Sequence, residues 1–93
     1  VVYYHIESQI NATQVMDNTN NSSTSGSNVQ TYAWSTGNGL RWSLASAGSS
    51  NYYIKSYTGL CLDLAGGSVG NGKNIQAYTC NNSTAQKWKF VEV

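Results

Sequence analysis

The sequence predicts an all-β protein built from two copies of one four-stranded unit. Apolar and polar residues alternate along short segments, and in residues 60–64 leucines occupy positions 60, 62 and 64. This period of two is typical of strands that bury one face. Stretches rich in Gly, Asn and Ser separate these segments and favour turns. No segment of about eleven residues has the spacing of an amphipathic helix, which leaves all-β as the predicted class.

The second half of the chain repeats the first half at an offset of 46 residues. Three segments align at this offset: VMD (15–17) with CLD (61–63), VQTY (29–32) with IQAY (75–78), and LRWSL (40–44) with QKWKF (86–90). Agreement of three segments at one offset is hard to obtain by chance and indicates a duplication. We therefore divide the single domain, residues 1–93, into repeat one (residues 1–47) and repeat two (residues 48–93).

Each repeat is expected to contain four short strands joined by polar turns. In repeat two the strands are predicted at residues 51–56, 60–64, 74–80 and 87–93. The Gly- and Asn-rich residues 65–72 are expected to form turns rather than a helix. In repeat one we expect an opening strand at residues 3–8, a polar turn region at residues 18–27, and the connection to repeat two at residues 46–50.

The composition excludes several classes of function. The net charge is +1 and only 10% of the residues are charged, so the surface has no basic footprint for nucleic acid. No apolar run reaches the length of a membrane-spanning helix, and we expect no membrane insertion. His5 is the only histidine and there is no Cys-x-x-Cys sequence, so no metal site is expected. Without a nucleotide-binding loop or a redox motif, the sequence predicts no cofactor.

Cys61 and Cys80 are the only cysteines, and they are compatible with a disulfide or with two reduced thiols. We favour the disulfide, and with it a secreted, extracellular protein, because disulfides persist in oxidising compartments. If the bridge joins the second and third strands of repeat two in antiparallel orientation, Asp63 lies opposite Tyr78. The carboxylate and the aromatic ring then share one face of the sheet.

The same pairing in repeat one places Asp17 opposite Tyr32, with Val15 facing Trp34 where repeat two has its cysteines. A carboxylate beside an aromatic ring suits a pyranose, which has hydroxyls at its rim and apolar C–H groups on one face. The alternative is that both tyrosines are ordinary strand residues and each aspartate caps a turn. Because the pair recurs in phase in both repeats, we favour a ligand site.

Three segments of repeat two, GLCLDL (59–64), NIQAYTC (74–80) and QKW (86–88), carry a resemblance to a known family. Repeat two resembles, along its whole length, one repeat of the ricin B-type lectin family, whose named signature is Gln-x-Trp. That family includes the family-13 carbohydrate-binding modules attached to many glycoside hydrolases. Repeat one is similar more faintly, with LRW (40–42) in place of the signature. The resemblance implies a β-trefoil-like fold and non-catalytic binding of a mono- or oligosaccharide or glycan, with galactose- or xylose-type sugars as the expected ligands.

The resemblance also implies roles for individual residues of repeat two. Asp63 would accept sugar hydroxyls and Tyr78 would be the stacking platform, while the wall of the pocket would be supported by Gln76 and Gln86. The family usually has Asn before the motif glutamine, whereas this chain has Ala85; the candidates to compensate are Asn81 and Asn82. The implied core consists of Leu62, Ile75, Trp88 and Phe90 in repeat two and of Met16, Val29, Trp42 and Leu44 in repeat one.

Repeat one retains the implied sugar-binding set only in part, as Asp17, Gln30 and Tyr32. Gly39 and Leu40 replace the Asn-Gln pair, and Asn38 lies one position away from the place where it would supply an amide.

A β-trefoil has three repeats, whereas this chain contains two. Two repeats alone would leave apolar surface exposed, so we expect a third repeat or an attached catalytic domain in a longer protein, or self-association. A protein-interaction or scaffold module with empty sugar pockets is the alternative function. Catalysis is not expected, because Asp17 and Asp63 would lie in separate repeats, beyond the about 5–10 Å that separates the carboxylates of glycosidases.

Overall fold

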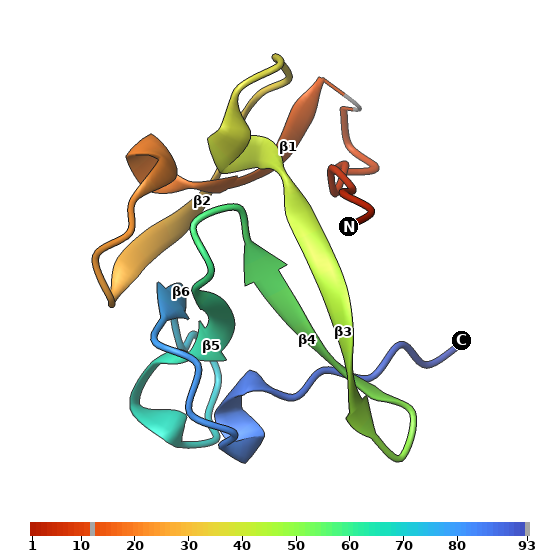
Figure 1. The fold of residues 1–93 in the computed structure, drawn as a ribbon. Helices are drawn as coiled ribbons and strands as arrows, with labels where there is room; N and C mark the ends of the chain where they lie inside the picture. Colours follow the sequence, from red (N-terminus) through yellow and green to blue (C-terminus); the bar gives the residue numbers. More distant parts are fainter. Residues whose placement is uncertain (12, 93) are drawn as a thin grey trace.

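The computed structural model describes residues 1–11 and 13–92 and confirms the all-β class (Figure 1). Six strands form one curled antiparallel sheet in the order β1-β2-β6-β5-β4-β3. The strands are β1 (Gln14–Asn18), β2 (Ser27–Ala33), β3 (Trp42–Gly48), β4 (Asn51–Ser56), β5 (Cys61–Leu64) and β6 (Ile75–Tyr78). Three single 3₁₀ turns lie between strands, η1 (Thr19–Asn21), η2 (Asn38–Leu40) and η3 (Ala65–Gly67), and a fourth, η4 (Thr84–Gln86), follows β6. The described residues contain no α-helix.

The two halves of the chain repeat each other's backbone pairings. Glu7 pairs with Val15 in repeat one, and Lys55 pairs with Cys61 in repeat two. Likewise, the bridge from Tyr4 to Trp42 has its counterpart in the bridge from Tyr52 to Trp88. The opening segments are related by 48 residues rather than 46 because the first turn of repeat one is two residues longer.

One side-chain hydrogen bond is also duplicated. The indole Nε1–H of Trp42 donates to the carbonyl oxygen of Met16 at 3.0 Å, and that of Trp88 donates to the carbonyl oxygen of Leu62 at 3.0 Å. Each bond satisfies the one polar group of a large apolar side chain. Each tryptophan is thereby fixed to the strand that carries the aspartate of its own repeat.

The core lies between the two repeats, around the buried side chains of Trp42, Ile54 and Leu62. Half-buried apolar side chains pack against this cluster: Ile6, Met16, Val29, Ile75 and Trp88. The implied core was wrong at two equivalent positions, since Leu44 is 40% exposed and Phe90 is 65% exposed. Leu44 lies on β3 of the β3–β4 hairpin, whose tip points away from β1 and β2 (Figure 1).

The predicted strands are shorter or absent at both ends of the chain. Residues 3–8 form only the two isolated bridges of Tyr4 and Glu7, and residues 87–92 form only the bridge of Trp88; residue 93 lies outside the described residues. In repeat one, β3 is a full strand because it pairs along its length with β4, the next opening strand. Among the described residues, no strand pairs along residues 88–92 in this way.

The connection between the repeats is a tight hairpin rather than a loop over residues 46–50. β3 runs to Gly48, which pairs with Asn51, so that only Ser49 and Ser50 lie in the turn. Both serines have left-handed backbone conformations, with φ of 52° and 65°. This is the geometry of a two-residue type I′ hairpin, and serine is an unusual residue for it, which is why the sequence did not reveal it.

The predicted pairing of the strands was wrong by two residues in both repeats. Asp63 lies opposite Gln76, and Tyr78 lies opposite Cys61; in repeat one, Asp17 likewise lies opposite Gln30, and Tyr32 opposite Val15. A shift of two residues keeps every side chain on its face of the sheet. Each aspartate and tyrosine therefore still share a face, as diagonal neighbours rather than as a direct cross-strand pair.

Candidate functional site

The Cys61–Cys80 disulfide fixes one end of the candidate site in repeat two. The bridge is present as predicted, with the two Cα atoms 5.1 Å apart. β6 ends at Tyr78, and the N–H of the next residue, Thr79, donates to Ser25 Oγ in repeat one at 2.8 Å. The chain therefore leaves the sheet before Cys80, and the disulfide joins β5 to this departing segment rather than to a strand residue opposite Cys61.

Asp63, a buried residue of β5, lines a small pocket in repeat two. The pocket has a volume of about 250 Å³ and is lined by Asp63, Gly66, Gly67, Gln76, Tyr78, Asn81, Ser83 and Ala85. These residues come from β5, η3, β6 and the segment that leads into η4. The glycines at 66 and 67 have φ of 77° and 63°, a backbone conformation that glycine adopts without a steric cost.

Gln86 holds Asp63 from below the pocket and is fully buried. Its Nε2 donates to Asp63 Oδ2 at 2.8 Å and to the carbonyl oxygen of Thr79 at 2.9 Å. Its Oε1 accepts the backbone N–H of Asn81 at 2.9 Å. One glutamine thus connects β5, the end of β6 and the loop that forms the lip of the pocket.

The other carboxylate oxygen of Asp63 is less strongly engaged. Gln76 Nε2 donates to Asp63 Oδ1 at 3.4 Å, a long distance for an N–H···O bond. Tyr78, which is 40% exposed, lines the same pocket. The pocket therefore offers an acceptor oxygen that is not fully satisfied, next to an accessible aromatic side chain.

Asn82 does not line the pocket but holds the same loop from outside. The hydroxyl of Tyr53 donates to Asn82 Oδ1 at 3.1 Å. Asn82 has a φ of 61°, in the left-handed region that asparagine tolerates better than most residues. The side chain that faces the pocket from this loop belongs instead to Asn81 or Ser83.

The equivalent site in repeat one is arranged differently around a similar aspartate. Gln30 Nε2 donates to Asp17 Oδ2 at 3.0 Å. Leu40 is buried where repeat two has Gln86, and a Cβ atom added to Gly39 would lie 2.8 Å from Asp17 Oδ1. The backbone of η2 therefore lies close to the Asp17 oxygen that Gln30 does not bind. This oxygen is the counterpart of the Asp63 oxygen that Gln86 holds in repeat two.

The two remaining predicted residues of repeat one, Tyr32 and Asn38, lie on β2 and in η2. Tyr32 is exposed on β2, two residues from Gln30 and on the same face, while Asn38 is half-buried in η2. The close approach of Gly39 to Asp17 could not be predicted from the sequence, because it is a backbone distance and not a residue type.

The family assignment follows from a match over nearly the whole chain. A family model described as the ricin-type beta-trefoil lectin domain matches residues 2–93. The chain belongs to the ricin-type β-trefoil lectin family. This confirms the family and the fold class that the sequence indicated, and membership of a lectin family supports carbohydrate binding as its general function.

Solved structures agree with this fold. The designed 3-fold symmetric protein ThreeFoil is 27% identical to the lectin-family chain, with a TM-score of 0.91, covering 98% of this chain and 65% of that one. The exo-beta-1,3-galactanase 1,3Gal43A from Clostridium thermocellum is 23% identical, with a TM-score of 0.83 and coverage of 98% and 22%. A Polyporus squamosus lectin bound to a human-type influenza-binding epitope is 20% identical, with a TM-score of 0.81 and coverage of 98% and 32%.

The chain spans less than two thirds of the length of each of these three structures. A search of curated proteins gave no significant match. Within the described residues, no helix is long and apolar enough to span a membrane, and no three His, Cys, Asp or Glu side chains are grouped to hold a metal ion.

Proposed function

We propose that the chain binds uncharged sugars, without catalysis, in the Asp63 pocket of repeat two. Asp63 Oδ1 accepts hydroxyl groups from one edge of the sugar, and the ring of Tyr78 packs against its apolar C–H face. The observation that carries this proposal is the 2.8 Å hydrogen bond from Gln86 to Asp63 Oδ2, which leaves Oδ1 of this pocket-lining residue with only a long 3.4 Å bond from Gln76.

The other residues of the site act as supports. Gln76 steers Oδ1 from the neighbouring strand, while Gln86 fixes both the carboxylate and the lip of the pocket. Asn82, held by Tyr53, keeps the lip in its left-handed turn. Asn81 and Ser83, which line the pocket, supply the polar groups that Ala85 lacks.

The charge of the pocket defines the ligand class. Asp63 is the one charged residue among the described residues that line it. A second anionic group placed near this carboxylate would be repelled, with no cation in the lining to compensate. Neutral hexoses and pentoses of galactose or xylose type, alone or at the end of an oligosaccharide, fit this requirement.

Repeat one provides at most a weaker second site, formed by Asp17, Gln30, Tyr32 and Asn38. Asp17 is buried and the backbone at Gly39 lies close to one of its oxygens, and Leu40 stands where repeat two has the amide of Gln86. The ring of Tyr32 is exposed on the same face of the sheet. The role proposed for Tyr32 is therefore contact with an extended oligosaccharide.

Binding without cleavage follows from the single carboxylate of the pocket, since glycoside hydrolysis uses a pair. The Cys61–Cys80 disulfide supports a secreted, extracellular location. In a longer protein, such a module would direct an attached domain, such as a glycoside hydrolase, to its glycan. The scaffold function with empty pockets remains the competing hypothesis, and it gains weight from the departure at Ala85.

A titration of the chain with galactose, lactose, xylose and xylo-oligosaccharides, followed by NMR or calorimetry, tests the proposal. We expect millimolar-to-micromolar binding to at least one of these sugars, lost in Tyr78→Ala, which changes a partly exposed side chain and should leave the fold intact. A folded protein that binds none of them would support the scaffold function instead.

A further inference from the structure

Three side chains of repeat one, Trp34, His5 and Glu7, form a cluster that the proposed sugar site does not use. The centroids of the Trp34 and His5 rings lie 4.2 Å apart, with the ring planes inclined by 40°. His5 Nε2 lies 2.8 Å from Glu7 Oε2. Because an ionised carboxylate only accepts hydrogen bonds, Nε2 carries the hydrogen and donates it to Glu7. These three residues are named the Trp34 cluster.

The backbone fixes this cluster on one face of the sheet. Glu7 pairs with Val15, which itself lies opposite Tyr32 of β2. Residues that are directly paired in antiparallel strands share a face, so Glu7 and Tyr32 lie on the same side. The N–H of Trp34 donates to the carbonyl oxygen of Thr13 at 2.7 Å, which continues the pairing of β1 and β2 beyond Ala33. Trp34, two residues after Tyr32, therefore shares this face.

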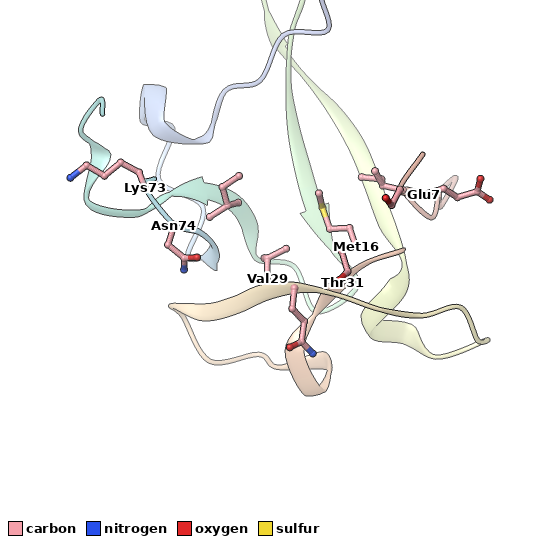
Figure 2. A pocket seen from close by; sticks show the side chains of 10 residues that line it. Glu7, Met16, Val29, Thr31, Lys73 and Asn74 are labelled. Atoms are coloured by element: carbon pink, nitrogen blue, oxygen red, sulfur yellow. The ribbon is translucent and has the colours of Figure 1, made fainter. Parts of the chain in front are cut away.

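This face points away from the core and is open to solvent. In the view of the apolar groove in Figure 2, the carboxylate of Glu7 points away from the core side chains Met16 and Val29. Trp34 is 51% exposed and Tyr32 is 59% exposed. The two aromatic side chains therefore offer an accessible apolar surface beside a carboxylate.

The carboxylate of Glu7 is not neutralised by a lysine or arginine. Residues 1–40 hold two of the four acidic residues of the chain and none of its five lysines and arginines. Among the described residues, His5 is the only basic side chain that contacts Glu7. Figure 2 shows Lys73 at the opposite end of the groove. Glu7 Oε1 has no hydrogen-bond partner in the described part of the chain, so a charged acceptor is left for a ligand.

Repeat two has a different chemistry at the equivalent positions. Cys80 stands in the place of Trp34 and belongs to the disulfide. Lys55 stands in the place of Glu7, so the charge is reversed. A cation that Glu7 attracts would be repelled by Lys55. The Trp34 cluster therefore predicts a ligand that repeat two does not bind at the corresponding place.

We propose that the Trp34 cluster binds an amino sugar, which is a pyranose with a free ammonium group. The ammonium donates to Glu7 Oε1 in a charge-assisted hydrogen bond, and the apolar C–H face of the sugar packs against the indole of Trp34. His5 is a positioning residue that holds the carboxylate beside the indole. This inference goes beyond the proposed function, because the residues and the charge of the ligand differ from those of the Asp63 pocket.

An amino sugar matches both parts of the cluster at once. A neutral sugar would contact the indole but leave the charge of Glu7 without a partner. A small cation without a sugar ring would contact Glu7 alone, and an exposed ion pair by itself contributes little. The amino sugar adds the aromatic contact to the ion pair, and its ammonium is also attracted by the electron-rich faces of Trp34 and Tyr32.

NMR titration with glucosamine and N-acetylglucosamine at neutral pH tests this proposal in the Asp63→Asn variant, which lacks the carboxylate of the other site. We expect the indole Nε1–H signal of Trp34 to shift. The indole signals of Trp42 and Trp88 are internal controls, because each Nε1–H is bonded to a backbone carbonyl. Glucosamine should bind at least about fivefold more tightly than N-acetylglucosamine, whose nitrogen is an uncharged amide. Tyr78→Ala replaces Asp63→Asn if that variant is unstable.

Matched variants then locate the charge and the aromatic contact. Glu7→Gln should lower the affinity for glucosamine to that for N-acetylglucosamine. Glu92→Gln removes the same charge from another exposed position and should change neither affinity. Trp34→Ala, measured by calorimetry, should abolish the binding of both sugars at this site. Glu7 and Trp34 are exposed, so both variants are expected to fold.

Four outcomes would overturn the proposal. The first is equal affinity for the two sugars, and the second is a preference for glucosamine that survives Glu7→Gln. The third is a preference that the unmodified protein shows and Asp63→Asn removes, which would place the amine in the Asp63 pocket. The fourth is methylammonium that binds as tightly as glucosamine, which would exclude a role for the sugar ring. None of these outcomes depends on whether the Asp63 pocket binds galactose or xylose, so the two proposals fail separately.

Discussion

Gln86 holds Asp63 through a 2.8 Å hydrogen bond, in the position that Leu40 occupies in repeat one. Both aspartates are buried, but the amide of Gln86 binds Asp63 whereas the backbone at Gly39 lies close to Asp17. We therefore expect the two repeats, although similar in sequence, to differ in sugar binding.

Replacing Gln86 by leucine should make repeat two resemble repeat one. Gln86→Leu leaves Asp63 Oδ2, the Thr79 carbonyl and the Asn81 N–H without their buried partner, so we expect a loss of about 2 kcal/mol or more in the free energy of unfolding. Urea denaturation measures this. Gln76→Leu is the control and should cost less, because its bond to Asp63 is long at 3.4 Å. Equal losses in the two variants would contradict the role assigned to Gln86.

Gly39 is predicted to tolerate no side chain. In Gly39→Ala the new Cβ would lie 2.8 Å from Asp17 Oδ1 and 2.9 Å from the carbonyl oxygen of Asn18, which should cost about 1–3 kcal/mol of stability. The reciprocal change in repeat two, Ala85→Gly, removes a methyl group in a 3₁₀ turn and should cost about 0.5–1 kcal/mol. Thermal unfolding of both variants measures the two losses of stability. A smaller loss of stability for Gly39→Ala than for Ala85→Gly would show that η2 does not lie so close to Asp17.

The β3–β4 hairpin should be improved by residues suited to its turn. Ser49 and Ser50 both have a positive φ, which Asn-Gly adopts more readily in type I′ hairpins. The double change Ser49→Asn and Ser50→Gly should therefore stabilise the protein by about 1 kcal/mol. Denaturant midpoints compare it with Ser23→Asn, a substitution at an exposed position outside the hairpin. A destabilised double variant would mean that the turn has another conformation in solution.

The duplicated tryptophans should differ in their contribution to stability. Both donate an indole hydrogen bond of 3.0 Å, but Trp42 is fully buried whereas Trp88 is only partly buried. Trp42→Phe should cost about 2–3 kcal/mol and Trp88→Phe about 1 kcal/mol, because the cavity left at the first site is enclosed. Chemical denaturation measures the loss of stability in each variant. A larger loss for Trp88→Phe than for Trp42→Phe would mean that the centre of the core lies in repeat two.

The charge of the pocket leads to a selectivity that can be measured with matched sugars. Galactose should bind at least tenfold more tightly than galacturonic acid, since the uronate would lie near Asp63 without a neutralising cation in the lining. Raising the salt concentration should reduce this difference in affinity, because salt screens the repulsion between the two carboxylates. Ser83→Lys, which adds a cation at the lip, should also narrow it, whereas Ser35→Lys adds the same charge elsewhere and should not. Equal affinities for the two sugars in the unmodified protein would contradict the proposal that Asp63 repels an anionic ligand.

Much of the fold could be predicted from the sequence because its signals are local and duplicated. The period-two segments, the 46-residue offset and the Gln-x-Trp signature indicated strands, repeats and family. The Cys61–Cys80 bridge could be predicted because the protein has only two cysteines. The register of β5 and β6 could not be predicted. The chain leaves β6 after Tyr78, where the N–H of Thr79 donates to Ser25 Oγ, and no local pattern encodes this contact between the repeats.

The candidate site was predictable in its residues but not in its asymmetry. Asp63, Gln76 and Tyr78 line one pocket, and Gln86 lies beneath it, as their positions in the repeat suggested. The exposure of Leu44 and Phe90 depends on which segments pack against them, and no local pattern encodes this. The close approach of Gly39 to Asp17 depends on a backbone distance rather than on a residue type.

The most direct test of the account is a calorimetric titration of Asp63→Asn and Asp17→Asn with the sugar that binds the unmodified protein. Asn is close to Asp in shape but presents one acceptor oxygen and no charge. We predict that Asp63→Asn weakens binding at least tenfold while Asp17→Asn changes it less than twofold, with one sugar bound per chain. Sugar binding that survives Asp63→Asn, or that is lost in Asp17→Asn, would contradict the assignment of the site to repeat two.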